Sequence, residues 1–449
     1  MRDPYFPRNS IDDRSLQGIT TDFIESGVDI LHRFRSQFEW LENRAANGVD
    51  PYSKSTAARI GVNAVVKLRD GTSCSGANFA SQDYLNLATH AHIHSAAKKA
   101  IDTYGVHSAG SAALMGSTEL SNLLERRLAG FLGYADCTVF PTGWGAGYGL
   151  VKTLIRSEDH IVIDVLAHAC LQEGARNATS NVYSFPHCSN AAVRRRLERI
   201  RATDTQCGIL VLTEGVFSMD SDVPDIEELQ AICRRHRATL MIDVAHDLGA
   251  LGATGRGMLE VQGMAGKVDI VMGSFSKTFA SNGGFVATNE RSLKLALRYN
   301  CGPLTFSNAL SPTQAAIVLA ALDIVESEEG AERRMRLMEN VSNLREGLAA
   351  EGFQLLGKPS AIVPVVLGGG AISRLATRYA QENGAIVNLI EYPAVSRNNC
   401  RWRLQVMAEH TARQIDELVR IAARAREAAE QYMENVHAEL RHEMGPVRL

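Results

Sequence analysis

The sequence predicts an α/β protein whose larger domain is built on a mainly parallel β-sheet. Between residues 137 and 288, six short apolar runs alternate with segments of helical periodicity. Such alternation is typical of right-handed βαβ units, in which helices cover both faces of the sheet. After Pro312 a long helical stretch precedes three more strand-like runs, which predicts a second, smaller α/β domain towards the C-terminus.

The elements of the larger domain are expected in order along the chain. Apolar positions from Ile30 to Leu41 recur at helical spacing and predict a helix within an N-terminal arm. Apolar and β-branched runs predict strands at Cys137–Pro141, Ile161–Asp164, Ile209–Thr213, Thr239–Asp243, Ile270–Gly273 and Phe285–Thr288. Helices are predicted over residues 119–132, 144–156, 191–202 and 226–237.

The smaller domain is predicted from the same kinds of pattern. Helices are expected at Gln314–Ser327 and Gly330–Gly352, strands at Ala361–Leu367, Ile386–Tyr392 and Arg403–Met407, and a last helix at Ala412–Arg441. The sequence therefore predicts an N-terminal helix and arm over residues 1–60, a large domain over residues 61–312, and a small domain over residues 313–449.

Composition excludes several classes of function. A hydrophobic content of 45% with 22% charged residues is that of a soluble globular protein, and a net charge of −3 argues against nucleic-acid or membrane-surface binding. No apolar run is long enough to span a bilayer, and the first ten residues lack the apolar core of a secretory signal. The eight cysteines include no C-x-x-C pair, which favours reduced thiols in the cytoplasm over disulfides or a metal site.

Lys277 is the most informative single residue. It lies in the Ser- and Gly-rich segment GSFSKTFASNGGF, directly after an apolar run. A lysine in such a turn is well placed to hold a carbonyl cofactor as a Schiff base, although an isolated lysine is more often a solvated surface charge. The polar residues upstream of it favour the first interpretation, because their order and spacing match what a pyridoxal phosphate (PLP) site needs.

Asp243 and His246 are the first of these residues. Asp243 ends a predicted strand, at the sheet edge where open α/β sheets bind ligands, and its carboxylate would keep the pyridine nitrogen of PLP protonated. His246 would hydrogen-bond the phenolate oxygen. Taken alone, Asp243 would more often cap the next helix, and His246 would more often be a satisfied, partly buried histidine.

Three more residues follow predicted strands. His168 would stack on the pyridine ring, or would simply begin a helix. Ser218 could donate to the phosphate or phenolate region. Glu214 would more often be a salt-bridge partner when taken alone.

The phosphate is predicted to meet the segment around Gly143 and Trp144, which joins a strand to a helix and offers N–H groups at a helix N-terminus. The hydroxyl of Ser274 lies three residues before Lys277 and could also reach it. The alternative for Gly143 is a turn with close helix packing. The segment does not fit G-x-G-x-x-G, so a nicotinamide-dependent dehydrogenase is not predicted.

Over roughly residues 75–425 the chain resembles the α-oxoamine synthases, a family of fold-type I PLP enzymes that includes 8-amino-7-oxononanoate synthase, glycine C-acetyltransferase and serine palmitoyltransferase. The resemblance is carried, in order, by segments that include FPTGWGAGYGL, DVLAHACLQEGAR, LTEGVFSMDSDVPDIEEL, MIDVAHDLGALGATGRG, GSFSKTFASNGGFVAT and RWRLQVMAEHT. It implies a large domain on a seven-stranded sheet and a smaller C-terminal α/β domain.

The resemblance also implies roles for residues that their own patterns leave open. Ser307 and Asn308 would reach the phosphate site of a neighbouring subunit, so a homodimer is expected. Arg403 would bind the amino-acid carboxylate; without the resemblance it would be a strand-edge surface charge. Gln82, which stands where the family usually has Asn, lies near that carboxylate in the family pattern. This and similar departures suggest a divergent branch.

The implied reaction condenses an amino acid with an acyl thioester, on coenzyme A or an acyl carrier protein, and releases carbon dioxide to give an α-amino ketone. An aminotransferase on the same fold is one alternative. A catalytically silent partner subunit is another, and the presence of Lys277, Asp243 and His246 argues against it.

Overall fold

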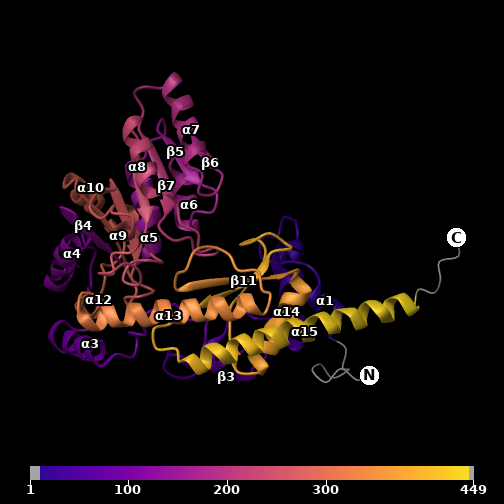
Figure 1. Ribbon diagram of the computed structural model, residues 1–449. Coiled ribbons are helices and arrows are strands. Elements are labelled where there is room, and N and C mark those ends of the chain that lie inside the picture. Colours follow the sequence, from indigo (N-terminus) through magenta and orange to yellow (C-terminus); the bar gives the residue numbers. More distant parts are fainter. Residues whose placement is uncertain (1–10, 444–449) are drawn as a thin grey trace. The chain divides into compact units, whose positions relative to one another are not determined.

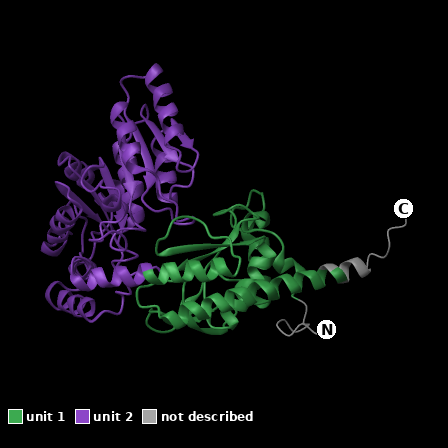
Figure 2. Ribbon diagram, viewed as in Figure 1, with its two compact units in different colours: residues 1–81, 339–449 green, residues 82–338 purple. Residues whose placement is uncertain are grey.

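The computed structural model describes residues 11–443 (Figure 1). They form two compact units (Figure 2): one comprises the described residues up to 81 and from 339 onward, and the other comprises residues 82–338. The predicted domain limits at residues 60 and 312 stay a prediction.

The unit of residues 82–338 is built on a seven-stranded sheet. From edge to edge its strands are β4 (Asp136–Phe140), β10 (Gly284–Thr288), β9 (Ile270–Ser274), β8 (Thr239–Asp243), β7 (Ile209–Glu214), β5 (His160–Asp164) and β6 (Val182–Phe185). Strand β10 runs antiparallel to both neighbours, and the other pairs are parallel. The α/β fold class with a mainly parallel sheet is therefore confirmed.

The central strands form because their residues are apolar on both faces. All six residues of β7 are buried, and so are four of the five in β8. A strand covered on both sides cannot alternate apolar with polar residues, and this is why the short continuous runs were recognisable in the sequence. Their side chains make one core with those of helices α5 (Gly143–Leu154) and α6 (Ala169–Ala178).

Helix α5 packs against α6 and against β9 and β10. It can approach so closely because it carries glycine at four alternate positions. A Cβ atom at Gly147 would lie 2.6 Å from Sγ of Cys170 and 3.1 Å from Cε of Met272. The remaining helices of this unit are α3 (Ala91–Tyr104), α4 (Glu119–Leu132), α7 (Asn190–Thr203), α8 (Ile226–Arg235), α9 (Met258–Val261), α10 (Ser292–Asn300), α11 (Gly302–Thr305) and α12 (Pro312–Val325).

The other unit contains two small sheets. One has the order β1 (Ser55–Thr56), β2 (Asn63–Lys67), β3 (Ser73–Asn78), β12 (Ala385–Ile386); the second has the order β11 (Ile362–Gly368), β14 (Cys400–Gln405), β13 (Leu389–Ile390). Its helical elements are α1 (Asp13–Leu16), η1 (Thr20–Phe23), η2 (His32–Phe34), α2 (Arg35–Ala46), α14 (Gly370–Glu382) and α15 (Ala412–Glu443). Helix α13 (Glu328–Ala350) begins in one unit and ends in the other.

Three local expectations need correction. The N-terminal helix begins later than Ile30, because residues 32–34 form a 3-10 turn and α2 starts at Arg35. The single strand expected at Ile386–Tyr392 is two short strands, β12 and β13, that pair in different sheets. Strand β6 and the hairpin of β2 and β3 were not predicted.

Candidate cofactor site

A cavity of about 260 Å³ lies at the end of the large sheet where β7, β8 and β9 finish. It is lined by Thr142, Gly143, Trp144, His168, Cys170, Glu214, Asp243, Ala245, His246, Met272, Ser274, Ser276, Lys277, Asn282 and Gly283. Eight of the residues singled out in the sequence therefore share one cavity, although they come from segments up to 134 positions apart (Gly143 to Lys277).

Two carboxyl groups stand side by side on neighbouring strands. Glu214 and Asp243 are partners in the register of β7 and β8, and their exposed fractions are only 2% and 6%. Burial raises the pKa of Asp243, and the charge of Lys277 is the largest influence that opposes that rise. Burial and the charge of Asp243 hold the pKa of Glu214 well above its usual range. Both carboxyl groups are therefore harder to ionise than in water, and Lys277 is a cation that favours the charged form of each.

The ring of His246 is held in place by a hydrogen bond with a tyrosine hydroxyl. Its Nδ1 atom lies 2.8 Å from the hydroxyl of Tyr84, and both side chains are buried. The contact restricts rotation of the imidazole ring, which stands on the cavity wall three residues after Asp243. Tyr84 had no predicted role, because its partner is 162 residues away along the chain.

His168 is held at the beginning of α6. Its backbone N–H donates to Oε1 of Glu214 at 2.7 Å, and its Nδ1 accepts from the backbone N–H of Cys170 at 3.3 Å. Sγ of Cys170 lies 3.0 Å from the same Nδ1 atom, and burial raises the pKa of this thiol, so the thiol is neutral and can donate. The indole of Trp144 meets the imidazole edge-on, with centroids 6.0 Å apart.

Lys277 lies in the loop that joins β9 to the antiparallel strand β10. The loop is closed at its base, where the N–H of Phe275 donates to the carbonyl oxygen of Gly283 at 3.0 Å. It is anchored by Phe275, whose ring lies 5.8 Å from Phe279 and 5.6 Å from Phe285 between centroids. All three phenyl groups are buried, so the loop that carries the lysine rests on a rigid aromatic base.

The N-terminus of α5 forms another part of the cavity wall, next to Ser274. Thr142 caps the helix by accepting from the N–H of Gly145 at 2.9 Å. A Cβ atom at Gly143 would lie 2.6 Å from both Cβ and Oγ of Ser274, so only glycine fits there. Oγ of Ser274 is in turn 2.8 Å from Oγ of Ser276. Helix N–H groups and clustered hydroxyls are what an anionic phosphate needs.

These residues fit pyridoxal phosphate. The cavity has a lysine for its aldehyde, a buried carboxyl group for its ring nitrogen, two imidazoles in its lining and a helix N-terminus for its phosphate. The individual role of each residue stays a prediction.

Five predicted site residues do not line this cavity. Ser218 lies in the turn after Glu214, and Gln82 lies in the segment before α3. Ser307 donates its hydroxyl to the carbonyl oxygen of Pro303, and the exposed amide of Asn308 lies 3.3 Å from Nε2 of His107. Arg403 lies on β14, in the other unit.

The sequence also missed residues that do line the cavity or touch its walls. Cys170 follows His168 by two positions, and its sulfur contacts the imidazole. Ser276 and Asn282 belong to the lysine loop, and only their position in that segment could have indicated them.

Residues 75–421 match the family model of the class I and II aminotransferases. The chain is 36% identical to an 8-amino-7-oxononanoate synthase from Geobacter metallireducens over 87% of this chain and 97% of that protein. It is 33% identical to a 2-amino-3-ketobutyrate coenzyme A ligase from Escherichia coli over 76% of this chain and 85% of that protein.

Solved structures give the same result. A serine palmitoyltransferase from Sphingomonas wittichii superposes with a TM-score of 0.83 at 28% identity, covering 90% of this chain and 99% of the other. A serine palmitoyltransferase solved with its PLP internal aldimine gives the same values.

Proposed function

Because the chain belongs to the class I and II aminotransferase family, and within it to the α-oxoamine synthases, we propose that it condenses an amino acid with an acyl thioester. The product is an α-amino ketone, and carbon dioxide and a free thiol are released. The observation that carries the proposal is the single cavity that unites Lys277, Asp243, His246 and His168 with the N-terminus of α5.

PLP, when bound, supplies an electron sink for the negative charge that develops at Cα of the amino acid. The chain's own groups do the rest. Lys277 holds the cofactor's aldehyde carbon between turnovers and moves the Cα proton, since an amine on a rigid loop can act as a general base once it is displaced. Asp243 would bind the ring nitrogen and keep it protonated, because a buried carboxylate favours a positive charge placed beside it.

The neighbouring residues orient the ring. His168 stacks on one face, with its position fixed by Glu214 and Cys170. His246 donates to the phenolate oxygen in an orientation set by Tyr84. The N-terminus of α5 and Ser274 bind the phosphate. Ser218 is assigned to the cofactor, and Gln82 and Arg403 to the amino-acid carboxylate, by their place in the family pattern.

We further propose a coenzyme A thioester as the acyl donor, in line with the similarity to a 2-amino-3-ketobutyrate coenzyme A ligase. We also propose a homodimer in which Ser307 and Asn308 contact the phosphate in the site of the partner subunit. No helix in the described part of the chain has the length and apolar character that crossing a bilayer requires. All eight cysteines are free, which agrees with a reducing cytoplasm.

The test is thiol release from the purified holoenzyme. Glycine, L-alanine and L-serine are each combined with acetyl-, octanoyl- and palmitoyl-coenzyme A, and the same matrix is run with Lys277→Ala. We expect release with one amino acid and one acyl length, and a loss of at least ~1,000-fold in Lys277→Ala, which lacks the general base. Lys98→Ala, on the exposed face of α3, is the matched control and should keep wild-type activity.

Two results would contradict the proposal. Release that does not depend on an amino acid would indicate simple thioester hydrolysis. Turnover that requires a keto acid and releases no thiol would instead show an aminotransferase.

A further inference from the structure

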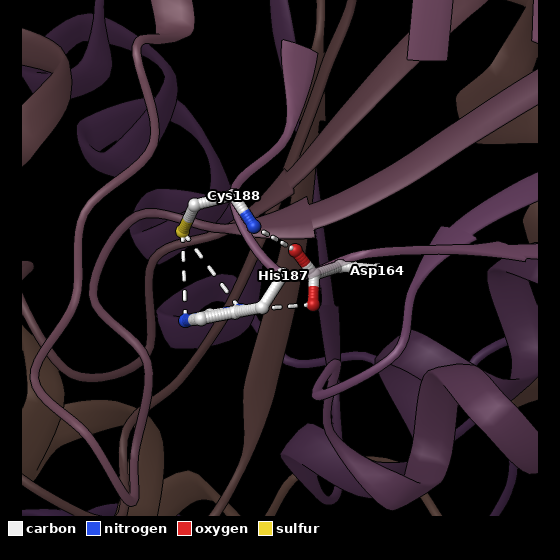
Figure 3. Close-up of side chains that lie close together, drawn as sticks. All are labelled: Asp164, His187 and Cys188. Carbon is white, nitrogen blue, oxygen red and sulfur yellow. Dashed lines mark hydrogen bonds and ion pairs between the residues drawn. The ribbon is translucent and has the colours of Figure 1, made fainter. Parts of the chain in front are cut away.

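Asp164 is the last residue of strand β5, and both of its carboxylate oxygens accept hydrogen bonds. It is fully buried. Its Oδ1 accepts from the backbone N–H of Leu166 at 2.9 Å and lies 3.0 Å from Nδ1 of His187. Its Oδ2 accepts from the backbone N–H of Cys188 at 2.8 Å. Figure 3 shows the carboxylate facing the imidazole, with the Cys188 sulfur on the other side of the ring.

The second nitrogen of His187 faces another carboxylate. Its Nε2 lies 3.2 Å from Oδ2 of Asp222, and the ring meets Phe217 at right angles, with centroids 4.4 Å apart. Burial lowers the pKa of His187, but the hydrogen bonds with Asp164 and Cys188 outweigh burial and raise that pKa to about 11. At neutral pH the ring is therefore an imidazolium that donates one N–H to each carboxylate.

These side chains are hydrogen-bonded to one another. Asp164, His187 and Cys188 lie close enough to suggest a metal centre, and so do His187, Asp220 and Asp222. In the structure, both oxygens of Asp164 accept N–H donors and both nitrogens of His187 face carboxylates. The arrangement is an ion-pair network that joins the end of β5 to the turn after β7.

That turn carries Ser218. It is closed by its own backbone, where the N–H of Phe217 donates to the carbonyl oxygen of Asp222 at 3.0 Å. Phe217 and Asp222, the first and last residues of this turn, both contact His187. The turn is therefore joined to the end of β5 through His187, in addition to its chain connection to β7.

We propose that His187 is a positioning residue that holds the turn of residues 217–222 so that Ser218 meets the bound cofactor. The inference rests on the proposed function, which assigns Ser218 to PLP. Asp164 holds the imidazolium of His187 in place, and the imidazolium contacts the turn at Asp222 and Phe217. Loss of the imidazole would remove the contacts with both Phe217 and Asp222 at once.

The test is a double-mutant cycle on the dissociation constant of PLP, measured by equilibrium dialysis of the full chain. His187→Gln is expected to weaken PLP binding about tenfold in the wild-type background. In the Ser218→Ala background it should weaken binding less than about twofold, because Ser218→Ala has already removed the contact with PLP that His187 positions. Asp222→Ala, at an exposed carboxylate, should give the same coupling if His187→Gln folds poorly.

His160→Gln is the matched control. His160 pairs with Asp204 at 3.0 Å, but at the opposite end of β5, and its replacement should leave the PLP dissociation constant within about twofold in both backgrounds. Equal losses on the two backgrounds, or no loss, would overturn the positioning role while the proposed function stands. A wild-type protein that binds no PLP would overturn both.

Discussion

Asp247 illustrates how tightly single residues are constrained around the site. It follows His246, is completely buried, and accepts from the backbone N–H of Met258 at 2.6 Å. A Cβ atom at Gly215 or Gly257 would lie 2.8 or 2.5 Å from its carboxyl oxygen. Burial raises the pKa of Asp247 to about 8. In the folded protein this carboxyl group therefore keeps its proton at neutral pH, whereas in the unfolded chain it would lose it.

Asp247→Asn should therefore stabilise the protein in a pH-dependent way. Between an unfolded pKa of 3.8 and a folded pKa of about 8, only the folded state holds the proton, so the wild-type free energy of unfolding falls as pH rises through this window. Asparagine does not titrate. The gain in the holoenzyme's melting temperature on substitution should be larger at pH 8 than at pH 5, by an amount equivalent to at least about 1 kcal/mol.

The exposed Asp416 provides the control, since Asp416→Asn should shift the melting temperature equally at both pH values. A gain from Asp247→Asn that is the same at pH 5 and pH 8 would show that the carboxyl is ionised in the fold.

Some residues of the site could be predicted from sequence, and others could not. Asp243 and Lys277 were recognisable because Asp243 ends one buried apolar strand and Lys277 follows another by three residues, and the end of a parallel strand is a defined place in the fold. Tyr84 and His187 were not, because their roles come from contacts with His246 and Asp222, which lie 162 and 35 residues away. No local pattern records such a pairing.

Among the elements, α5 does most to shape the cavity. Its N-terminus is capped by Thr142, and its glycines let it lie against β9 and the lysine loop. Gly143 is the point of closest approach, since its missing side chain leaves the room that Ser274 occupies. Any side chain at position 143 must therefore displace either the helix N-terminus or the hydroxyl group beside it.

Gly143→Ala should weaken PLP binding at least about tenfold, because a Cβ atom 2.6 Å from Ser274 forces apart two groups assigned to the phosphate. Gly130→Ala is the matched control. Gly130 lies within α4 with no atom near its missing Cβ, so alanine should leave affinity unchanged and add about 0.5–1 kcal/mol of stability. Equilibrium dialysis and thermal unfolding measure both effects; equal PLP affinity in the two variants would exclude α5 from the phosphate site.

At the level of elements, the predictable strands were those buried on both faces. Strand β6 was not predicted because it is an edge strand in which only one residue of four is buried. The run Ile386–Tyr392 has the pattern of one strand, but its residues belong to strands in two different sheets. Strand β12 pairs with β3, and strand β13 pairs with β14. Hydrophobic pattern shows that a segment is buried, and it does not show which neighbour buries it.

At the scale of the whole molecule, one surface of residues 82–338 is unusually apolar. Leu114, Met115 and Phe306 are exposed by 87%, 91% and 88%. Their two loops are neighbours, because the N–H of Ala309 donates to the carbonyl oxygen of Gly110 at 2.9 Å. Apolar groups gathered in this way are typical of a surface that a partner covers, which supports the proposed homodimer.

The double substitution Leu114→Asp/Met115→Asp should therefore produce a monomer that binds PLP weakly, since burying two carboxylates at an interface is costly and Ser307 and Asn308 could no longer serve the other subunit. Light scattering after size exclusion gives the mass. Met335→Asp, at a methionine exposed by 66% on α13, is the control and should remain a dimer. A dimer that survives the double substitution would place the interface elsewhere.

If the cavity holds PLP on Lys277, chemical reduction of the bound cofactor will mark that lysine. The purified holoenzyme is reduced with sodium borohydride, digested, and analysed by peptide mass spectrometry. We predict a phosphopyridoxyl group on Lys277 alone, in the peptide that contains residues 273–285. The same group on a different lysine, or no modified lysine in a protein that has PLP bound, would contradict the account.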